Sequence, residues 1–388
     1  MLKGWAALFH RFMGNPVSMQ RLHSLDALRG FDMMWIISGE IIVHALAVAS
    51  ADPVSVWMSG QLRHTAWHGF TFYDMIFPLF IYIAGISMPF SMGRKLEGKA
   101  GVELKRARKE VYGALLKRTL ILVVCGMVVN GALEFGGYEQ TRFASVLGRI
   151  AFAGLFAGLI VLNCRLRVQV VVFAVVLLGY WALLMLVPVP GIGAGVLTPE
   201  GNLAGYVDRC LLPGRLHRTI YDPEGILSTL PAVATALLGV FTGRFLRTRS
   251  VGDLYKGILI GASGLVLLGA GWLWSLVFPV NKILWTSSFV LYAGGWSLLL
   301  MAVFYLVVDV WRLKRWSLPL QWIGTNSILI YMASHGVVDF EYSSRFLFGG
   351  LVQGFAMPWQ EVAIGSGMLI IQLFLLRFLF KKKWFLKV

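Results

Sequence analysis

The feature that most constrains the fold of this chain is a series of apolar stretches of roughly 20 residues each. A helix of that length crosses about 30 Å of hydrocarbon, because each residue adds about 1.5 Å. Hydrophobic residues make up 57% of the chain and charged residues only 14%, which excludes an ordinary soluble domain. We therefore predict an all-α polytopic membrane protein with about ten transmembrane helices. The stretches lie near residues 27–49, 71–92, 118–134, 144–163, 168–187, 226–246, 257–278, 285–310, 319–336 and 359–380.

The charge of the chain predicts its orientation. Its formal net charge of +16 would suggest nucleic acid for a soluble protein, but in a membrane protein it indicates cationic cytoplasmic loops. Assigning alternate loops to the two sides places most Lys and Arg residues on one side, including RKLEGKAGVELKRARKEVYGALLKR and the terminal KKKWFLKV. We predict that both termini are cytoplasmic, that the partner surface is membrane lipid, and that the protein does not bind nucleic acid.

The chain shows no linker that would divide it. We predict a cytoplasmic amphipathic segment over residues 1–24 and a single transmembrane domain over 25–388. The outer connection over 188–225 is long and rich in Gly and Pro, which indicates a functional or disordered segment rather than a plain turn. Cys125, Cys164 and Cys210 are too widely spaced for a metal cluster or a disulfide framework, so no metal site is predicted.

Ionisable residues lie directly against an apolar segment in the run QLRHTAWHGFTFYDMIFPLFIYIAGISMPFSM. His64 and His68 precede the segment, and Asp74 lies inside its first turn. Such groups usually mark a functional site or a helix cap, because desolvating them is costly. In a functional interpretation, Asp74 holds one ring nitrogen of His64 and leaves the other basic enough to take a proton. In a structural one, Thr71-Phe-Tyr-Asp74 is a capping box. The residues alone leave both open.

Two more ionisable residues occur inside the first apolar stretch. Glu40 and His44 are four residues apart and share one helix face near the outer boundary. They either pair with each other and fix helix packing, or line a polar cavity, which we favour.

Polar residues also occur in two later stretches. Arg149 lies in the outer part of the predicted helix 144–163, where we expect an acidic partner or an anionic ligand. Asn326 and Ser327 lie mid-span in the predicted helix 319–336, where small polar residues commonly pack helices.

An outer turn, PVNKILWTSS, has a composition suited to a sugar. Asn281 and Lys282 offer donors for hydroxyls, and Trp285 offers an aromatic face for the ring. Tryptophan and lysine are also ordinary at the membrane interface, and Trp67 fits an interfacial anchor equally well. No Walker loop, HExxH, GxSxG or CxxC signature accompanies these residues, so general motifs name no enzyme class.

Several separated motifs resemble, in their order, the membrane domain of the heparan-α-glucosaminide N-acetyltransferase family and its bacterial members. They are RLHSLDALRGFDMM, RHTAWHGFTFYDMIFPLFIYIAGISM, SVLGRIA, AGYVDRCLL with YDPEGILSTL, FPVNKILW and GTNSILIY. The resemblance extends from about Arg21 to Tyr331, and YDPEGIL and PVNK-x-LW are its most specific parts.

The resemblance implies a transmembrane acyltransferase fold, usually a homodimer, that transfers acetyl from cytoplasmic acetyl-CoA to the amine of a terminal glucosamine on the outer side. The family's catalytic histidine falls on His64, and its aspartate at the following helix start falls on Asp74. A third active-site position, an asparagine in the animal enzymes, falls on Glu40. A carboxylate there could bind the substrate ammonium or act as a base.

On this hypothesis, His64 is either a general base or a transient acetyl carrier, and the sequence is compatible with both roles. The candidate amino-sugar contacts are Trp67, Asn281, Lys282, Trp285 and Glu224. The candidate acetyl-CoA contacts are Arg29, Arg94, Lys95, Arg149, Asn326 and Ser327.

Two other hypotheses remain open. One is an inner-membrane transporter of N-acetylglucosamine or related sugars, which a ten-helix bundle with midplane polar residues also suits. The other is acylation of a cell-surface polysaccharide with a different acyl group. The chain lacks an Asn-X-Ser/Thr acceptor and the extra lumenal region of the animal enzymes, so we expect a bacterial inner-membrane protein with His64 facing the periplasm.

Overall fold

The computed structural model describes residues 22–386, and this part of the chain is helical, without strands. The predicted all-α class is therefore confirmed. Residues 1–21 of the predicted cytoplasmic segment lie outside the described residues, and His23 already begins a helix. The chain forms two compact units. Unit 1 contains residues 67–69 and 77–303, and unit 2 contains residues 22–66, 70–76 and 304–386.

Within residues 22–386, nine helices are long and apolar enough to cross a membrane. This confirms a polytopic membrane protein, with one span fewer than the ten expected. The nine are His23–Ser50, Phe72–Leu96, Gly101–Val129, Val146–Asn163, Leu166–Leu186, Thr229–Arg247, Asp253–Ser275, Ser287–Val310 and Met357–Lys382.

The missing span is the predicted helix 319–336, which is broken at Asn326. It consists of α13 (Leu318–Thr325), α14 (Ser327–Met332) and the π-helical turn η5 (Ala333–Val337). The Asn326 side chain donates to the Trp384 carbonyl at 2.9 Å and accepts from the Leu386 amide at 3.0 Å. The asparagine therefore ties the break to the end of the chain.

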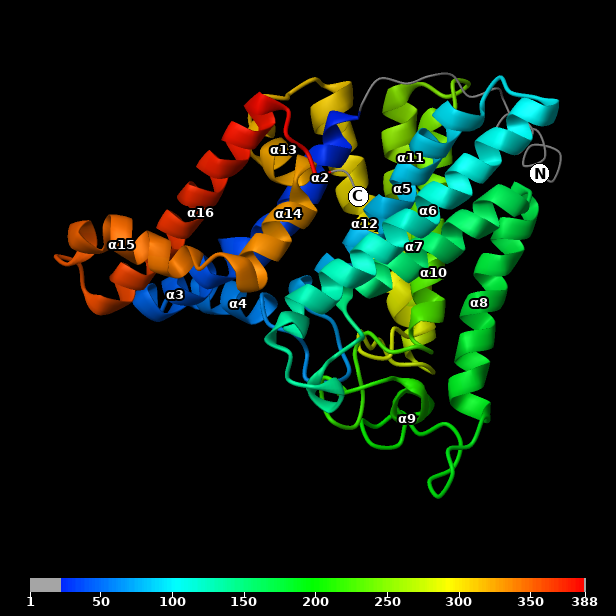
Figure 1. Ribbon diagram of the computed structural model, residues 1–388, viewed down its shortest axis with the longest axis horizontal. Helices are drawn as coiled ribbons and strands as arrows, with labels where there is room; N and C mark the ends of the chain where they lie inside the picture. The colour runs from blue at the N-terminus through cyan, green and yellow to red at the C-terminus, as the bar shows by residue number, and fades with distance from the viewer. Residues whose placement is uncertain (1–21, 387–388) are drawn as a thin grey trace. The chain divides into compact units, whose positions relative to one another are not determined.

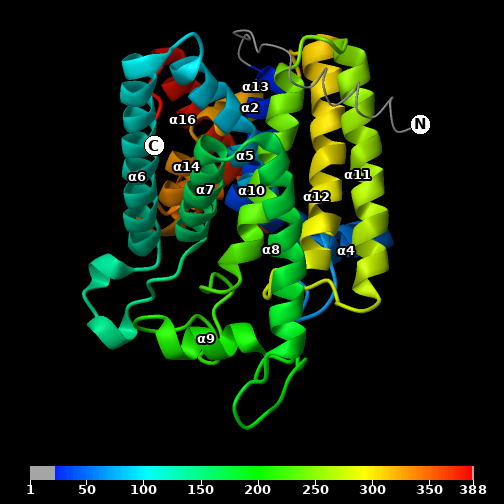
Figure 2. The same cartoon turned by 90° about the vertical axis from the view of Figure 1, so that its right-hand side faces the viewer.

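Unit 1 is built around α10 (Thr229–Arg247), most of which is buried. It packs closely on α5 (Phe72–Leu96), since a Cβ on Gly85 would collide with the Ala236 carbonyl and one on Gly239 with the Tyr82 carbonyl. Glycine is needed at both crossings because the backbones nearly touch. The other long helices of the unit are α6 (Gly101–Val129), α7 (Val146–Asn163), α8 (Leu166–Leu186), α11 (Asp253–Ser275) and α12 (Ser287–Phe304), with α11 and α12 side by side (Figure 2).

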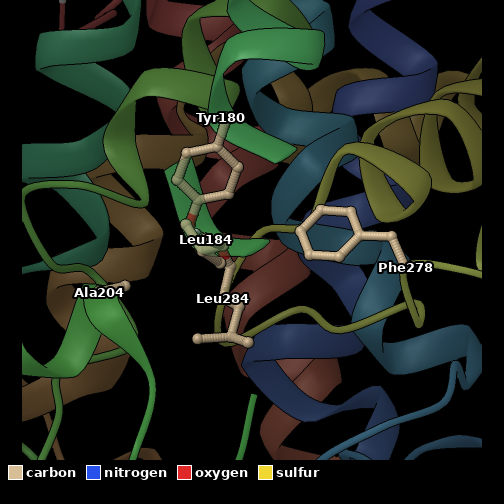
Figure 3. Close-up of a cluster of buried hydrophobic side chains, with 5 residues drawn as sticks. All are labelled: Tyr180, Leu184, Ala204, Phe278 and Leu284. Atoms are coloured by element: carbon tan, nitrogen blue, oxygen red, sulfur yellow. Dashed lines mark hydrogen bonds between the residues drawn. The ribbon is translucent and has the colours of Figure 1, made fainter. Parts of the chain in front are cut away.

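The long connection after α8 is ordered and carries its own helix, α9 (Leu203–Leu211). A buried apolar cluster joins Ala204 of α9 to Tyr180 and Leu184 of α8 and to Phe278 and Leu284 of the α11–α12 turn (Figure 3). The Tyr180 hydroxyl donates to the Leu284 carbonyl at 2.5 Å. The connection is thus a packed structural element.

Unit 2 begins with one continuous helix made of α2 (His23–Met34), the π-helical turn η1 (Trp35–Gly39) and α3 (Glu40–Ser50). Its α2 part crosses α13 at Gly30 and Gly324, where backbone atoms meet. The unit also contains α4 (Pro53–Gln61), the turn η4 (Tyr305–Val310), α15 (Phe340–Val352) and α16 (Met357–Lys382), which contacts α3 and α15 (Figure 1). A π-turn inside an α-helix often marks a functional position, and η1 ends directly before Glu40.

Candidate active site

The loop between α4 and α5 in unit 2 is held at both of its ends. The Gln61 side chain accepts from the Phe72 amide at 3.2 Å, and the Thr71 hydroxyl donates to the Arg63 carbonyl at 2.7 Å. These bonds position the intervening residues, including His64, against the start of α5.

His64 and Asp74 are hydrogen-bonded. Nδ1 of His64 donates to Oδ1 of Asp74 at 2.8 Å, which leaves Nε2 as the ring position able to take a proton. The Asp74 side chain is 1% exposed, whereas that of His64 is 52% exposed. A buried carboxylate that fixes the tautomer of an accessible imidazole is the arrangement of a general base.

The same aspartate caps α5. Its Oδ2 accepts from the Thr71 amide at 3.2 Å and from the Thr65 amide at 3.3 Å, the Thr65 hydroxyl donates to it at 3.1 Å, and the Thr71 hydroxyl oxygen also lies 3.1 Å away. The His64 contact of the functional interpretation and the Thr71 contact of the structural one therefore coexist, one on each carboxylate oxygen, while the catalytic role stays a prediction.

Tyr73 extends the site toward Glu40. Its ring lies against the His64 imidazole, with centroids 4.7 Å apart, and its hydroxyl interacts with the Glu40 carboxylate. Glu40 and His64 are thus joined through one aromatic side chain. The sequence analysis missed Tyr73, although it occupies the first turn of α5 beside Asp74.

Glu40 also lines a cavity of about 560 Å³ in unit 2. His335, Asp339 and Glu341 lie on the same cavity, and all three are exposed. Asp339 caps α15 by accepting from the Tyr342 amide at 2.8 Å, and His335 stacks on Tyr331 with centroids 4.5 Å apart. Three carboxylates on one cavity favour a cationic ligand. Asp339 and Glu341 were not among the predicted site residues. They lie in the connection between the predicted helices 319–336 and 359–380, where no motif marks them.

His44 takes a different partner from Glu40. Its Nδ1 is hydrogen-bonded to the Ser59 hydroxyl of α4 at 2.7 Å. The alternative in which Glu40 and His44 satisfy each other is therefore wrong, and Glu40 is the member that lines a cavity.

Most candidate sugar contacts lie in unit 1 and have partners within the protein. Trp67 donates to the Leu197 carbonyl at 2.7 Å and lies 5.2 Å from the Tyr221 ring. Asn281 is fully buried, accepting from the Leu284 amide and donating to Nδ1 of His68, while Trp285, also fully buried, donates to Thr235. Lys282 is half-buried. Their role with a sugar stays a prediction.

Glu224, the fifth of these candidates, belongs to a buried ionic cluster. Arg142 binds both Asp222 and Glu224, with its Nε 2.8 Å from Asp222 Oδ2. Burial alone would raise the pKa of the Asp222 carboxyl, but the bond and charge of Arg142 outweigh it and hold that pKa below its usual range. Burial instead raises the pKa of Asp208 to about 6. The YDPEGIL motif thus supplies partners for an arginine.

Arg149 of α7 is deeply buried. Nη2 bonds to the Ser228 hydroxyl, and the guanidinium lies over the Trp285 ring at 4.9 Å. Its Nε and Nη1 have no hydrogen-bond partner among the described residues. The prediction that Arg149 meets an acidic partner or an anionic ligand rests here on the nearby charges of Glu224, Asp222 and Asp208, none of which it touches.

The remaining acetyl-CoA candidates divide between the two units. Arg94 and Lys95 are exposed in the last turn of α5 in unit 1. Arg29 lies in unit 2, 3.6 Å from Asp26, and the amide of Asn326 is bonded to the chain end, with Ser327 buried beside it. Neither unit gathers all of these candidates, and their role stays a prediction.

The spans define a polytopic membrane protein, and the His64–Asp74 pair at the start of α5 is its candidate general-base site. The family model described as heparan-α-glucosaminide N-acetyltransferase, catalytic, matches residues 21–274. The chain belongs to this family, which confirms the resemblance of its motifs.

Two similar proteins are the heparan-α-glucosaminide N-acetyltransferases of Homo sapiens and Mus musculus. The human protein is 28% identical over 371 residues, covering 80% of this chain and 52% of its own length. The mouse protein is 26% identical over 377 residues, covering 83% and 54%. The chain thus spans about half the length of these relatives.

Proposed function

We propose that this protein is a membrane N-acetyltransferase that moves an acetyl group from acetyl-CoA to the amine of glucosamine or of a glucosamine-ended saccharide. The observation that carries the proposal is the hydrogen bond from His64 to the buried Asp74, beside a Tyr73–Glu40 pair. Membership of the family supplies the reaction class.

The reaction assigns each of these side chains a task. An amine attacks a thioester only as the free base, so the ammonium must lose a proton, and Nε2 of His64 accepts it. Nitrogen then bonds to the carbonyl carbon, the carbon–sulfur bond breaks, and CoA leaves as the thiolate with the pair of electrons. The nitrogen loses a second proton to become an amide, and the thiolate takes up one proton to become the thiol. Asp74 holds the tautomer of the neutral His64 imidazole before the transfer and stabilises the imidazolium after it.

The acceptor amine fits the cavity that Glu40 lines. An amino sugar arrives largely as a cation, and the carboxylates of Glu40, Asp339 and Glu341 would attract it. Of these three carboxylates, Glu40 is the one connected to His64, because it interacts with Tyr73, whose ring packs on the His64 imidazole. We assign it the positioning of the amine.

The test uses full-length protein purified in detergent, supplied with acetyl-CoA and glucosamine. Wild type should form N-acetylglucosamine and free thiol, His64→Ala should not, and His217→Ala, an exposed histidine in the loop after α9, should match wild type. No acetylated product from wild type with any of several amino sugars would reject the enzyme. Uptake of those sugars into proteoliposomes would then support the transporter.

Omitting the sugar separates the two routes through His64. Release of one CoA per protein and a labelled histidine would support an acetyl carrier, because only that route has a half-reaction without acceptor. No release would support direct transfer.

We further propose that the protein is a homodimer of a bacterial inner membrane, with both termini cytoplasmic and His64 facing the periplasm. The bias of Lys and Arg between alternate loops supports this orientation. Arg63→Cys in a variant without Cys125, Cys164 and Cys210 should react with an impermeant maleimide in intact cells. Labelling only after the inner membrane is opened would reverse the orientation, and light scattering would give the oligomeric state.

A further inference from the structure

One end of unit 1 contains a cavity of about 570 Å³ that takes no part in the proposed reaction. It lies where α5, α7 and α10 end and where α6 and α8 begin. Because these helices are membrane spans, the cavity at their ends lies at the depth of the lipid headgroups. Four arginines line it: Arg108, Arg165, Arg244 and Arg247.

The cavity carries an excess of positive charge. Arg247 is nearly buried and is bonded to the Glu97 carboxylate and the Pro89 carbonyl, so its charge has a partner. Arg108 donates to the Leu162 carbonyl at 2.9 Å, which leaves its charge uncompensated.

The other two arginines are less constrained. Arg244 is half-buried, Arg165 is exposed, and neither side chain makes a hydrogen bond or ion pair with any residue of the described chain. The guanidinium of Arg244 meets the charge of Arg247 instead. No carboxylate lies among the described residues that line the cavity. An anion would relieve this repulsion.

The remaining wall is mostly apolar, with Met92 and Leu96 of α5, Val161 and Leu162 of α7, and Leu166 of α8. Guanidinium groups bind phosphate oxygens in a bidentate manner, and an apolar wall suits a hydrocarbon chain. None of the described lining residues is aromatic or carries a side-chain amide, so the cavity offers a nucleotide base no aromatic ring to stack on and no amide to pair with. The chemistry therefore favours a lipid over a nucleotide.

We propose that this cavity is a binding site for an anionic phospholipid. Arg165 and Arg244 bind the phosphate of the headgroup, and the first part of an acyl chain lies along Met92 and Leu96. Basic pockets between transmembrane helices bind lipid headgroups in this way. This site is independent of the His64 centre and of the proposed acetyl transfer.

The test is native mass spectrometry of the full-length protein in detergent, titrated with phosphatidylglycerol or with phosphatidylcholine of the same chains. Wild type should bind phosphatidylglycerol at least about fivefold more tightly, since one Lys or Arg near an anionic surface accounts for about a fivefold change. The Arg165→Gln/Arg244→Gln variant should lose this preference. Arg167→Gln removes one charge from the same end of α8, outside the cavity, and should bind within twofold of wild type.

Arg165→Gln alone guards against misfolding, because the Arg165 side chain is exposed and the substitution keeps the backbone carbonyl that accepts from the Gln169 amide. It should weaken phosphatidylglycerol binding by at least twofold with an unchanged melting curve. Equal affinity of wild type and both variants would overturn the proposal. So would equal binding of the two lipids, or displacement of phosphatidylglycerol by adenosine 3′,5′-bisphosphate, which would assign the arginines to a nucleotide.

Discussion

His64 and Asp74 are joined by a 2.8 Å hydrogen bond that uses only one of the two carboxylate oxygens, while the other caps the helix that carries it. The orientation of the proposed base is therefore coupled to the beginning of α5. Asp74 is buried, and its second oxygen also accepts from the amide of Thr65, the residue after His64.

Removing the imidazole should abolish the chemical step. We expect His64→Ala to lower kcat by about 100-fold to 10,000-fold, the usual contribution of a positioned base. The measurement is the initial rate of N-acetylglucosamine formation. The apparent Tm should stay within a few degrees of wild type, because the His64 side chain is half-exposed. An unchanged kcat would show that the proton goes elsewhere.

The two tasks of Asp74 should separate in different variants. In Asp74→Asn the amide oxygen can still cap α5, but the amide nitrogen would then face Nδ1 of His64 and favour the wrong tautomer. We expect a large loss of kcat with a small loss of stability.

Asp74→Ala removes the cap as well and should cost about 0.5–2 kcal/mol more. Apparent Tm and kcat, measured on both variants, check this. Equal stability of the two variants would mean that the cap contributes nothing.

Glu40 should act on the acceptor rather than on the donor. Glu40→Gln keeps an acceptor for the Tyr73 hydroxyl and removes the charge, so KM for glucosamine should rise about tenfold, as expected for losing a charged hydrogen bond. KM for acetyl-CoA should not change.

Tyr73→Phe tests the interaction between the Tyr73 hydroxyl and the Glu40 carboxylate from the tyrosine side. It should lower kcat with less effect on KM, since the ring that packs on His64 remains.

For Glu40→Gln, a rise in KM for acetyl-CoA would contradict the assignment of Glu40 to the acceptor amine.

Arg142 should matter for stability because it neutralises carboxylates that are buried. Arg142→Gln leaves Asp222 charged and buried without its partner, which typically costs about 3–5 kcal/mol. Arg345→Gln is the control, because Arg345 binds Glu341 and Glu361 at the surface, where such pairs contribute at most about 1 kcal/mol. Apparent Tm values of the two variants should differ clearly, and similar values would refute the distinction.

Asp208 should make the protein less stable as the pH rises. Its carboxyl has a pKa of about 6 in the folded protein, raised by burial, against about 3.9 when unfolded. The folded state then binds more protons between these two values, so stability falls from about pH 4 to pH 6 and stays lower above it.

Asp208→Asn can still accept from the Ile226 amide and has no proton to lose. It should therefore raise the apparent Tm at pH 7.5 relative to wild type and leave it unchanged near pH 4. A difference of the same size at both pH values would indicate packing rather than ionisation.

Hydropathy along the chain predicts the class of protein and nine of the spans, because hydropathy over 20 residues is a local property of the chain. The sequence also supplied His64 and Asp74, which are ten residues apart and meet across one short loop. The broken helix was out of reach, since Asn326 is bonded to residues 58 and 60 positions further on.

The surroundings of the His64–Asp74 pair depend on tertiary contacts. Glu40 meets Tyr73 from another helix, and Asn281 and Trp285, polar and interfacial by composition, are fully buried. The four arginines of the proposed lipid site come from three helix ends, with Arg108 in α6, Arg165 directly before α8, and Arg244 and Arg247 in α10. Hydropathy and capping act between near neighbours in the chain, whereas cavities and charge clusters arise from contacts between distant segments, which no local pattern records.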